Sequence, residues 1–174
     1  MKSAIFFILA IFFLHYGCQA QVDLASKIVY NSFEIVKNQS PNSSFSIGVS
    51  KSIVLGNYGN PLSTEIMPWD DYPSEISGWK YGNNYIYIDN EREVLFGFKI
   101  VDSNFYIIYN DQSIKVGDNI SILSNIFPAS YQNKYDDLIS IELTTTNGEA
   151  LDEMLEVYYD PSSNIITGLS IGYR

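Results

Sequence analysis

The chain has 174 residues, of which 46% are hydrophobic and 15% aromatic, and 20 Asp and Glu against 10 Lys and Arg give it a net charge of −10 at pH 7. A chain this acidic repels phosphate groups, so we expect neither nucleic acid nor an anionic lipid surface as its ligand, whereas a basic protein partner is compatible with the charge. The only cysteine is Cys18 and the only histidine is His15. The residues after Cys18 therefore contain no disulfide, no thiolate nucleophile, no Ser-His-Asp triad and no imidazole or thiolate ligand for zinc. We expect no cofactor and no metal.

The N-terminal residues have the features of an export signal. Lys2 precedes an apolar run, Ala4–Leu14, that has the length of a signal-peptide core and is too short to span a bilayer. We expect residues 1–20 to be cleaved as a signal peptide and the protein to be exported to a periplasmic or extracellular location. The alternative is lipidation of Cys18, which would anchor the protein to a membrane, although the bulky residues before Cys18 fit a lipobox poorly. No later apolar run is long enough to cross a membrane.

Residues 21–45 are interpreted as an N-terminal helix followed by a linker. Apolar residues recur near helical spacing between Val22 and Lys37, with Asp23 in the first turn and Lys37 in the last. The polar stretch Asn38–Ser44 contains a proline and is typical of a linker.

Two later segments resemble each other. Residues 85–100 (YIYIDNEREVLFGFKI) align with residues 156–171 (EVYYDPSSNIITGLSI), so that the turn residues Asp89 and Asp160 coincide at an offset of 71. Farther upstream, short apolar stretches match at an offset two residues smaller. A near-constant offset across separate elements indicates a duplication, with repeat 1 at residues 46–112 and repeat 2 at residues 113–174.

Each repeat is interpreted as a short helix followed by three or four consecutive strands. Strand candidates at residues 76–81 and 137–145 precede the two hairpins, and Gly-Asn or Asn-Gly pairs connect them. Consecutive strands joined by short turns predict an antiparallel meander. The predicted fold class is therefore α+β, with two tandem helix-plus-meander repeats and the helices on one face of the sheet or sheets.

Short motifs carry a family resemblance. Ile47-Gly48 lies at the expected helix entry, Gly59-Asn60-Pro61 at its exit, and Trp79-Lys80-Tyr81 at the start of a strand, and copy two keeps the first motif as Val116-Gly117. With these motifs, residues 46–172 resemble the tandem β-lactamase-inhibitor-protein fold, and a single unit is similar to the SmpA/OmlA outer-membrane assembly lipoproteins. The resemblance implies protein binding rather than catalysis. The lack of disulfides departs from the inhibitor proteins, and the poor lipobox departs from the lipoproteins.

Strand alternation predicts which side chains of the hairpins lie on the face away from the helices. Val94, Phe96, Phe98 and Ile100 are expected to face the core, and tyrosines opposite mid-strand glycines are expected on the other face. Aromatic side chains supply contact area at a low entropic cost, which makes them candidates for binding a partner. The alternative is an ordinary solvent-facing sheet, because tyrosine is a common strand residue. The candidates on this face are Tyr85, Tyr87, Tyr158 and Trp79, with Tyr81 in the other register.

Two loops add aromatic and acidic candidates. The loop MPWDDYP places Trp69 and Tyr72 around Asp70 and Asp71 between two prolines, a combination that suits insertion into a basic cleft. The alternative is that Trp69 folds back to cover the core. The comparable loop of copy two, ASYQNKYDD, contributes Tyr131.

We expect an exported, non-enzymatic protein-binding module of the bacterial cell envelope, either an assembly accessory or an inhibitor or immunity-type protein. The alternative is a carboxylate-dependent hydrolase acting on envelope glycans, because glycoside hydrolysis requires only two acids at a set separation. Ser77-Gly78-Trp79-Lys80 fits a serine acyl-enzyme pattern, but a strand start places Ser77 and Lys80 on opposite faces, so this hypothesis is discarded. The acids available for hydrolysis are Asp70, Asp71, Glu75, Asp136 and Asp137.

Overall fold

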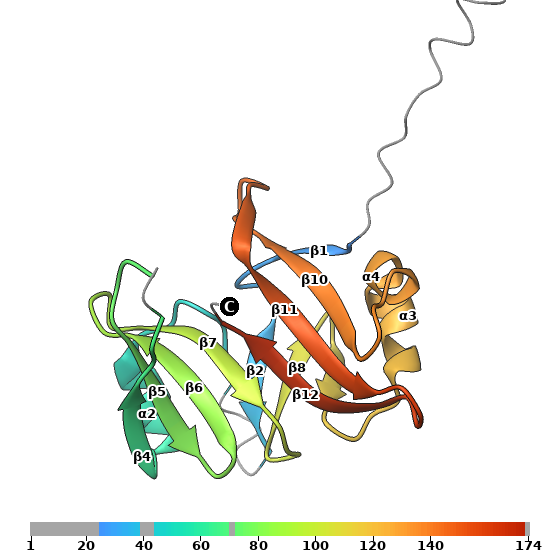
Figure 1. Ribbon diagram of the computed structural model, residues 1–174. Helices are drawn as coiled ribbons and strands as arrows, with labels where there is room; N and C mark the ends of the chain where they lie inside the picture. Colours follow the sequence, from blue (N-terminus) through green and yellow to red (C-terminus); the bar gives the residue numbers. More distant parts are fainter. Residues whose placement is uncertain (1–24, 39–43, 70–71, 173–174) are drawn as a thin grey trace, which may run out of the picture.

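The computed structural model describes residues 25–38, 44–69 and 72–172. Within them the chain forms two β-sheets that share one core, with short helices at their margins (Figure 1). The predicted signal peptide, Cys18, Asp70 and Asp71 lie outside the described residues.

The larger sheet has eight strands and the smaller has four. In spatial order the larger sheet contains β1 (Lys27–Val29), β10 (Leu138–Thr144), β11 (Ala150–Asp160), β12 (Ile165–Ile171), β7 (Val94–Ile100), β6 (Asn84–Asp89), β5 (Ile76–Tyr81) and β4 (Ser63–Ile66). The smaller sheet contains β3 (Ser44–Phe45), β2 (Glu34–Lys37), β8 (Phe105–Tyr109) and β9 (Gln112–Lys115). The helical segments are α2 (Lys51–Tyr58), the 3-10 helix η1 (Ile120–Ile122), α3 (Leu123–Ile126) and α4 (Pro128–Gln132). Strands β1 and β10 pair in parallel, and the other pairs are antiparallel.

The predicted α+β class is wrong. Strands account for 49% of the described residues and helices for 14%, and two sheets replace the two helix-plus-meander repeats. Figure 1 shows α2 near one end of the larger sheet and α3 with α4 near the other. The smaller sheet supplies the covering layer that was expected from helices, because its buried residues join the core of the larger sheet. These residues are Ile35, Phe45, Phe105, Ile107 and Ile114, and Phe33 joins them from just before β2.

Strands also replace the helix expected between Val22 and Lys37, as far as this segment is described. Strand β1 pairs with β10, and β2 pairs with both β3 and β8. The buried residues Ile28, Ile35 and Val36 are β-branched, and such side chains pack well on a pleated surface. Tertiary pairing therefore outweighs the helical spacing that the sequence presents.

A local twofold axis relates the hairpins β6–β7 and β11–β12. They meet along β7 and β12, where Phe98 pairs with Ile171, Lys99 with Ser170 and Ile100 with Leu169. Because each residue of β7 is aligned with the residue of β12 that lies 71 positions later, exchanging the hairpins leaves this pairing unchanged. The axis passes through the Lys99–Ser170 pair. The pairing of β2 with β8 has the same symmetry. The proposed division into repeats at residues 46–112 and 113–174 stays a prediction.

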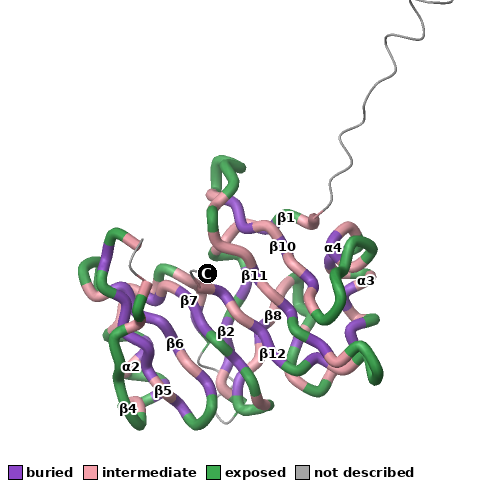
Figure 2. Tube along the Cα trace, in the orientation of Figure 1, coloured by how far each residue is buried: buried purple, intermediate pink, exposed green. Residues whose placement is uncertain are grey.

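Each of these hairpins contains a one-residue bulge at the equivalent place. Tyr87 pairs with Gly97 and Ile88 with Leu95, which leaves Phe96 as the extra residue. A bulge exchanges the two faces of the strand beyond it. Leu95 is therefore fully buried in the core, whereas Phe96 and Val94 are only half-buried. The expectation that Val94 and Phe96 face the core is wrong for this reason. Figure 2 shows the buried segments concentrated in the central strands and exposed residues at the turns.

Candidate functional site

The face of the larger sheet that points away from the smaller sheet, here called the open face, carries the predicted tyrosines. One row of paired positions crosses six strands of this face, with the local twofold axis at its centre. Beside this row lie Tyr87, opposite Gly97, and Tyr158, opposite Gly168. The row consists of Lys80, Tyr85, Lys99, Ser170, Glu156 and Ser140.

Trp69 covers Tyr87. The two ring centroids lie 4.9 Å apart in an edge-on arrangement, and Tyr87 is only 5% exposed. The indole also lies over Gly172, since a Cβ added there would come within 3.3 Å of it. Trp69 thus folds back onto the sheet, as one of the two interpretations of its loop expected, although it covers the open face and not the core between the sheets. Next to it, the Tyr72 ring packs on Phe96 with centroids 4.6 Å apart.

Tyr158 is the twofold equivalent of Tyr87 and is more exposed. Its side chain is 38% exposed, and its hydroxyl donates a hydrogen bond to the carboxylate of Glu156. Val101, which takes the place equivalent to Gly172, is 37% exposed. These side chains belong to a hollow of about 600 Å³, here called the open-face hollow. It is lined by Met67, Trp69, Tyr87, Lys99, Val101, Asp137, Glu156, Tyr158, Thr167, Gly168, Ser170 and Gly172.

The remaining predicted residues lie elsewhere. Trp79 does not lie on the open face, because it is 5% exposed and belongs to the core. Tyr85 stacks on Tyr87 with centroids 6.4 Å apart but does not line the hollow. Tyr131 lies in α4, where the ammonium of Lys134 is 4.4 Å from its ring centroid.

The acids considered for hydrolysis are dispersed where they are described. Glu75, just before β5, accepts a hydrogen bond from Asn90. Asp136 and Asp137 precede β10, and four strands lie between β10 and β5 in the sheet.

The packing of Trp69 on Tyr87 is expected to affect the pKa of Tyr87. Burial, the main cause, raises the pKa of Tyr87 to about 12, and the neighbouring Tyr85 and Glu65 add to the shift. Replacing Trp69 with alanine would hydrate the phenol, so we expect the pKa of Tyr87 to fall towards the ordinary value of 10.0. An NMR pH titration of ring-labelled tyrosines measures this change. In the control Tyr158→Phe the pKa of Tyr87 should keep its raised value, and an unchanged value in Trp69→Ala would contradict the packing.

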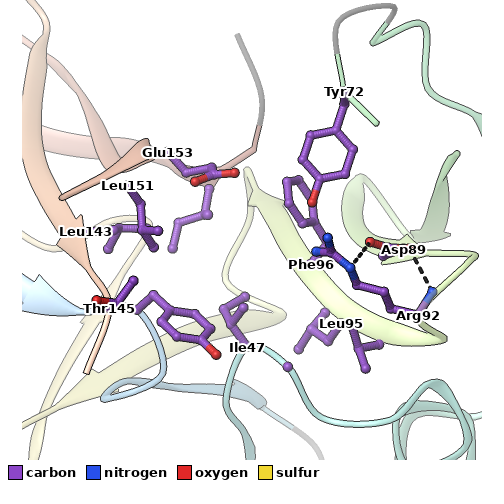
Figure 3. Close-up of a pocket in the computed structure, with 14 residues that line it drawn as sticks. Ile47, Tyr72, Asp89, Arg92, Leu95, Phe96, Leu143, Thr145, Leu151 and Glu153 are labelled. Atoms are coloured by element: carbon purple, nitrogen blue, oxygen red, sulfur yellow. Dashed lines mark hydrogen bonds and ion pairs between the residues drawn. The ribbon is translucent and has the colours of Figure 1, made fainter. Parts of the chain in front are cut away.

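A second concavity lies where β12 ends and the N-terminal part of β7 continues without it. This seam cavity has a volume of about 480 Å³ (Figure 3). Its apolar walls come from segments far apart in the sequence, and its polar side chains include Asp89, Arg92, Tyr72, Thr145 and Glu153. The apolar lining includes Tyr30, Ile47, Leu95, Phe96, Leu143, Leu151 and Ile171.

Asp89 is the buried carboxylate of the seam cavity. It is 0% exposed, and its Oδ1 accepts hydrogen bonds from the backbone N–H groups of Glu91 and Arg92, each at 3.0 Å. Its Oδ2 is buried and has no hydrogen-bond partner among the described residues. The nearest cation is the Arg92 guanidinium, whose Nε lies 3.7 Å from Oδ2, beyond hydrogen-bonding distance (Figure 3).

The pKa of Tyr72 depends on burial and on the charges around the cavity. Burial is the largest influence and raises the pKa of the Tyr72 phenol. The Arg92 guanidinium opposes this shift, while the carboxylates of Asp89 and Glu153 reinforce it. The phenol therefore stays protonated at neutral pH and lies within the field of one cation and two anions.

Sequence reasoning named Tyr72 as a binding candidate, which stays a prediction, and it did not name Asp89, Arg92 or Glu153, which line the same cavity. Asp89 was recognised only as a turn residue aligned with Asp160. The turn pattern contains no signal for its burial, because Leu143, Leu151 and Glu153 reach the cavity from the distant strands β10 and β11.

No family model, curated protein or solved structure matched this chain. The resemblance to the inhibitor-protein and assembly-lipoprotein folds therefore stays a prediction. Across residues 25–38, 44–69 and 72–172, no helix combines the length and the apolar character needed to span a membrane. The same residues contain no cluster of three or more His, Cys, Asp or Glu side chains that could hold a metal ion.

Proposed function

We propose that the protein is an exported, non-enzymatic binding module of the bacterial cell envelope that docks a protein partner in the open-face hollow. The proposal includes both versions of such a module, an assembly accessory and an inhibitor or immunity-type protein. A partner that places an aromatic side chain on Tyr158 would complete this face.

One observation carries the proposal. Two tyrosines take equivalent positions about the local twofold axis: Trp69 covers Tyr87, which is 5% exposed, whereas Tyr158 is 38% exposed. The covered half shows which chemistry fits such a position, an aromatic ring lying edge-on to a tyrosine beside a mid-strand glycine. The open half therefore supports an aromatic or long apolar side chain of a partner as its occupant.

Rigidity and charge favour the same conclusion. Tyr158 lies in β11, which is hydrogen-bonded on both sides to β10 and β12, so little conformational entropy would be lost on docking. The acids Asp137 and Glu156 line the hollow together with the single cation Lys99. With the net charge of −10, this composition suits a partner surface that is basic around its aromatic anchor.

The proposal is tested by affinity capture from an envelope extract with the exported protein and two variants. Tyr158→Glu places a charge at the centre of the hollow and is expected to weaken retention of the partner by more than about 30-fold, the effect of losing a central aromatic contact of about 2 kcal/mol. Tyr135→Glu is the matched control, because Tyr135 is 75% exposed and does not line the hollow. Circular dichroism verifies that both variants are folded.

Two outcomes would contradict the proposal. Equal retention of one partner by the wild type and Tyr158→Glu would show that the hollow is not the docking surface. Equal loss of the partner in Tyr135→Glu and Tyr158→Glu would show that retention depends on general charge alone.

A further inference from the structure

We propose that the seam cavity is a binding site for a small ligand that combines an apolar body with a protonated amine, and that the Oδ2 atom of Asp89 accepts the hydrogen bond of the amine. The open-face hollow and the seam cavity share no lining residue. This inference is therefore independent of the function proposed for the hollow.

The dimensions and walls of the cavity suit a small molecule. Its volume of about 480 Å³ lies within the range of about 300–1,000 Å³ that is typical of ligand pockets. Different strands contribute opposite walls, with Leu95 from β7 on one side and Leu143 and Leu151 from β10 and β11 on the other (Figure 3). These apolar walls would take the body of the ligand, because contact with them removes apolar surface from water.

Asp89 supplies the polar anchor. A buried carboxylate oxygen without a hydrogen bond is unfavourable, so native structures rarely contain one that has no role. The equivalent turn shows that the fold does not require a carboxylate oxygen without a hydrogen bond. There the Oδ1 of Asp160 accepts from the N–H and hydroxyl of Ser162, and its Oδ2 accepts from the hydroxyl of Ser163. These hydrogen bonds lower the pKa of Asp160.

The two turns differ at all four residues after the aspartate, and the position that decides the contact of Oδ2 is the one held by Ser163 in the second turn. The residue aligned with Ser163 is Arg92, whose side chain is 64% exposed and whose Nε stays 3.7 Å from Asp89 Oδ2. Solvent screens the guanidinium, whereas the carboxylate is buried and screened much less. With Glu153 also on the wall, the polar part of the cavity carries one more anion than cation. This balance favours a cationic donor, and an ammonium–carboxylate hydrogen bond is among the stronger ones in proteins.

The test uses phenethylamine and its uncharged analogue 2-phenylethanol as probes, titrated into the labelled protein and followed by two-dimensional NMR. We expect phenethylamine to shift the amide signals of Glu91 and Arg92, whose N–H groups donate to Asp89. We expect the alcohol to bind at least about 10-fold more weakly, because it lacks the charge that the carboxylate recognises. In Asp89→Asn the affinity for the amine should fall at least about 10-fold while that for the alcohol stays unchanged.

Three further variants keep the test decisive. Asp89→Asn retains the Oδ1 acceptor that holds the turn, and Asp160→Asn, its twofold equivalent, should bind both probes like the wild type. Leu151→Trp is expected to fill the cavity and block both probes, and Glu153→Gln should weaken the amine alone. The proposal is overturned if neither probe binds, if the alcohol binds as tightly as the amine, or if Asp89→Asn and Asp160→Asn bind the amine equally.

Discussion

Replacing Gly97 with alanine is expected to destabilise the protein by about 3 kcal/mol, the upper part of the range for overpacking a rigid site. A Cβ on Gly97 would lie 2.2 Å from the carbonyl oxygen of Ile171 and 3.0 Å from its carbon. The obstacle is backbone at the end of β12, so it cannot rotate away as a flexible side chain would. Chemical denaturation followed by circular dichroism measures the loss.

The twofold equivalent Gly168 provides the control for this prediction. A Cβ on Gly168 would lie 3.4 Å from the carbonyl oxygen of Ile100, which is an ordinary van der Waals contact. We therefore expect Gly168→Ala to change the free energy of unfolding by less than about 1 kcal/mol. Similar losses for Gly97→Ala and Gly168→Ala would show that β12 does not end against Gly97 as described.

Truncating Phe98 is expected to lower the free energy of unfolding by about 3–5 kcal/mol. Phe98 is 0% exposed and lies where the two hairpins join, paired with Ile86 on one side and Ile171 on the other. Its ring also meets Phe33 edge-on, with centroids 6.1 Å apart, so it links the larger sheet to the segment before β2. Phe98→Ala would remove these contacts and leave a cavity in the shared core. Denaturant titration of the wild type and the variant checks the expectation.

Leu62→Ala is the matched control, because Leu62 is 77% exposed and the expected change is within about 0.5 kcal/mol. If Phe98→Ala lost no more stability than Leu62→Ala, the two sheets would not share the core described here.

The local strand signals predicted the hairpins, because a turn aspartate and alternating apolar residues act over a few positions. Asp89 and Asp160 do mark the turns of β6–β7 and β11–β12. The face of each residue was less predictable, since one extra residue in each strand reverses the alternation at Phe96 and Thr167. No local sequence pattern predicts such a bulge.

Local sequence patterns also failed to predict the N-terminal strands and the seam cavity, for a different reason. Ile28 and Ile35 are compatible with a helix by spacing, and only their pairing with β10 and β8 makes them strand residues. The open-face tyrosines were recognisable from the sequence because mid-strand glycines lie opposite them. The buried state of Asp89 was not, because it depends on how the two hairpins are joined.

The parallel pairing of β1 with β10 also determines when folding can finish. Thr144 donates its hydroxyl to the carbonyl of Ile28, 116 residues earlier, and the N–H of Ser26 donates to Ser130, 104 residues later. A ribosome adds about 5–20 residues per second, so β1 waits on the order of 10 s for its partner strand. During synthesis the edge of the larger sheet therefore stays incomplete until most of the chain has been made. We propose that the protein is exported, and for such a chain this late pairing would leave β1 unpaired while the rest is still being translated.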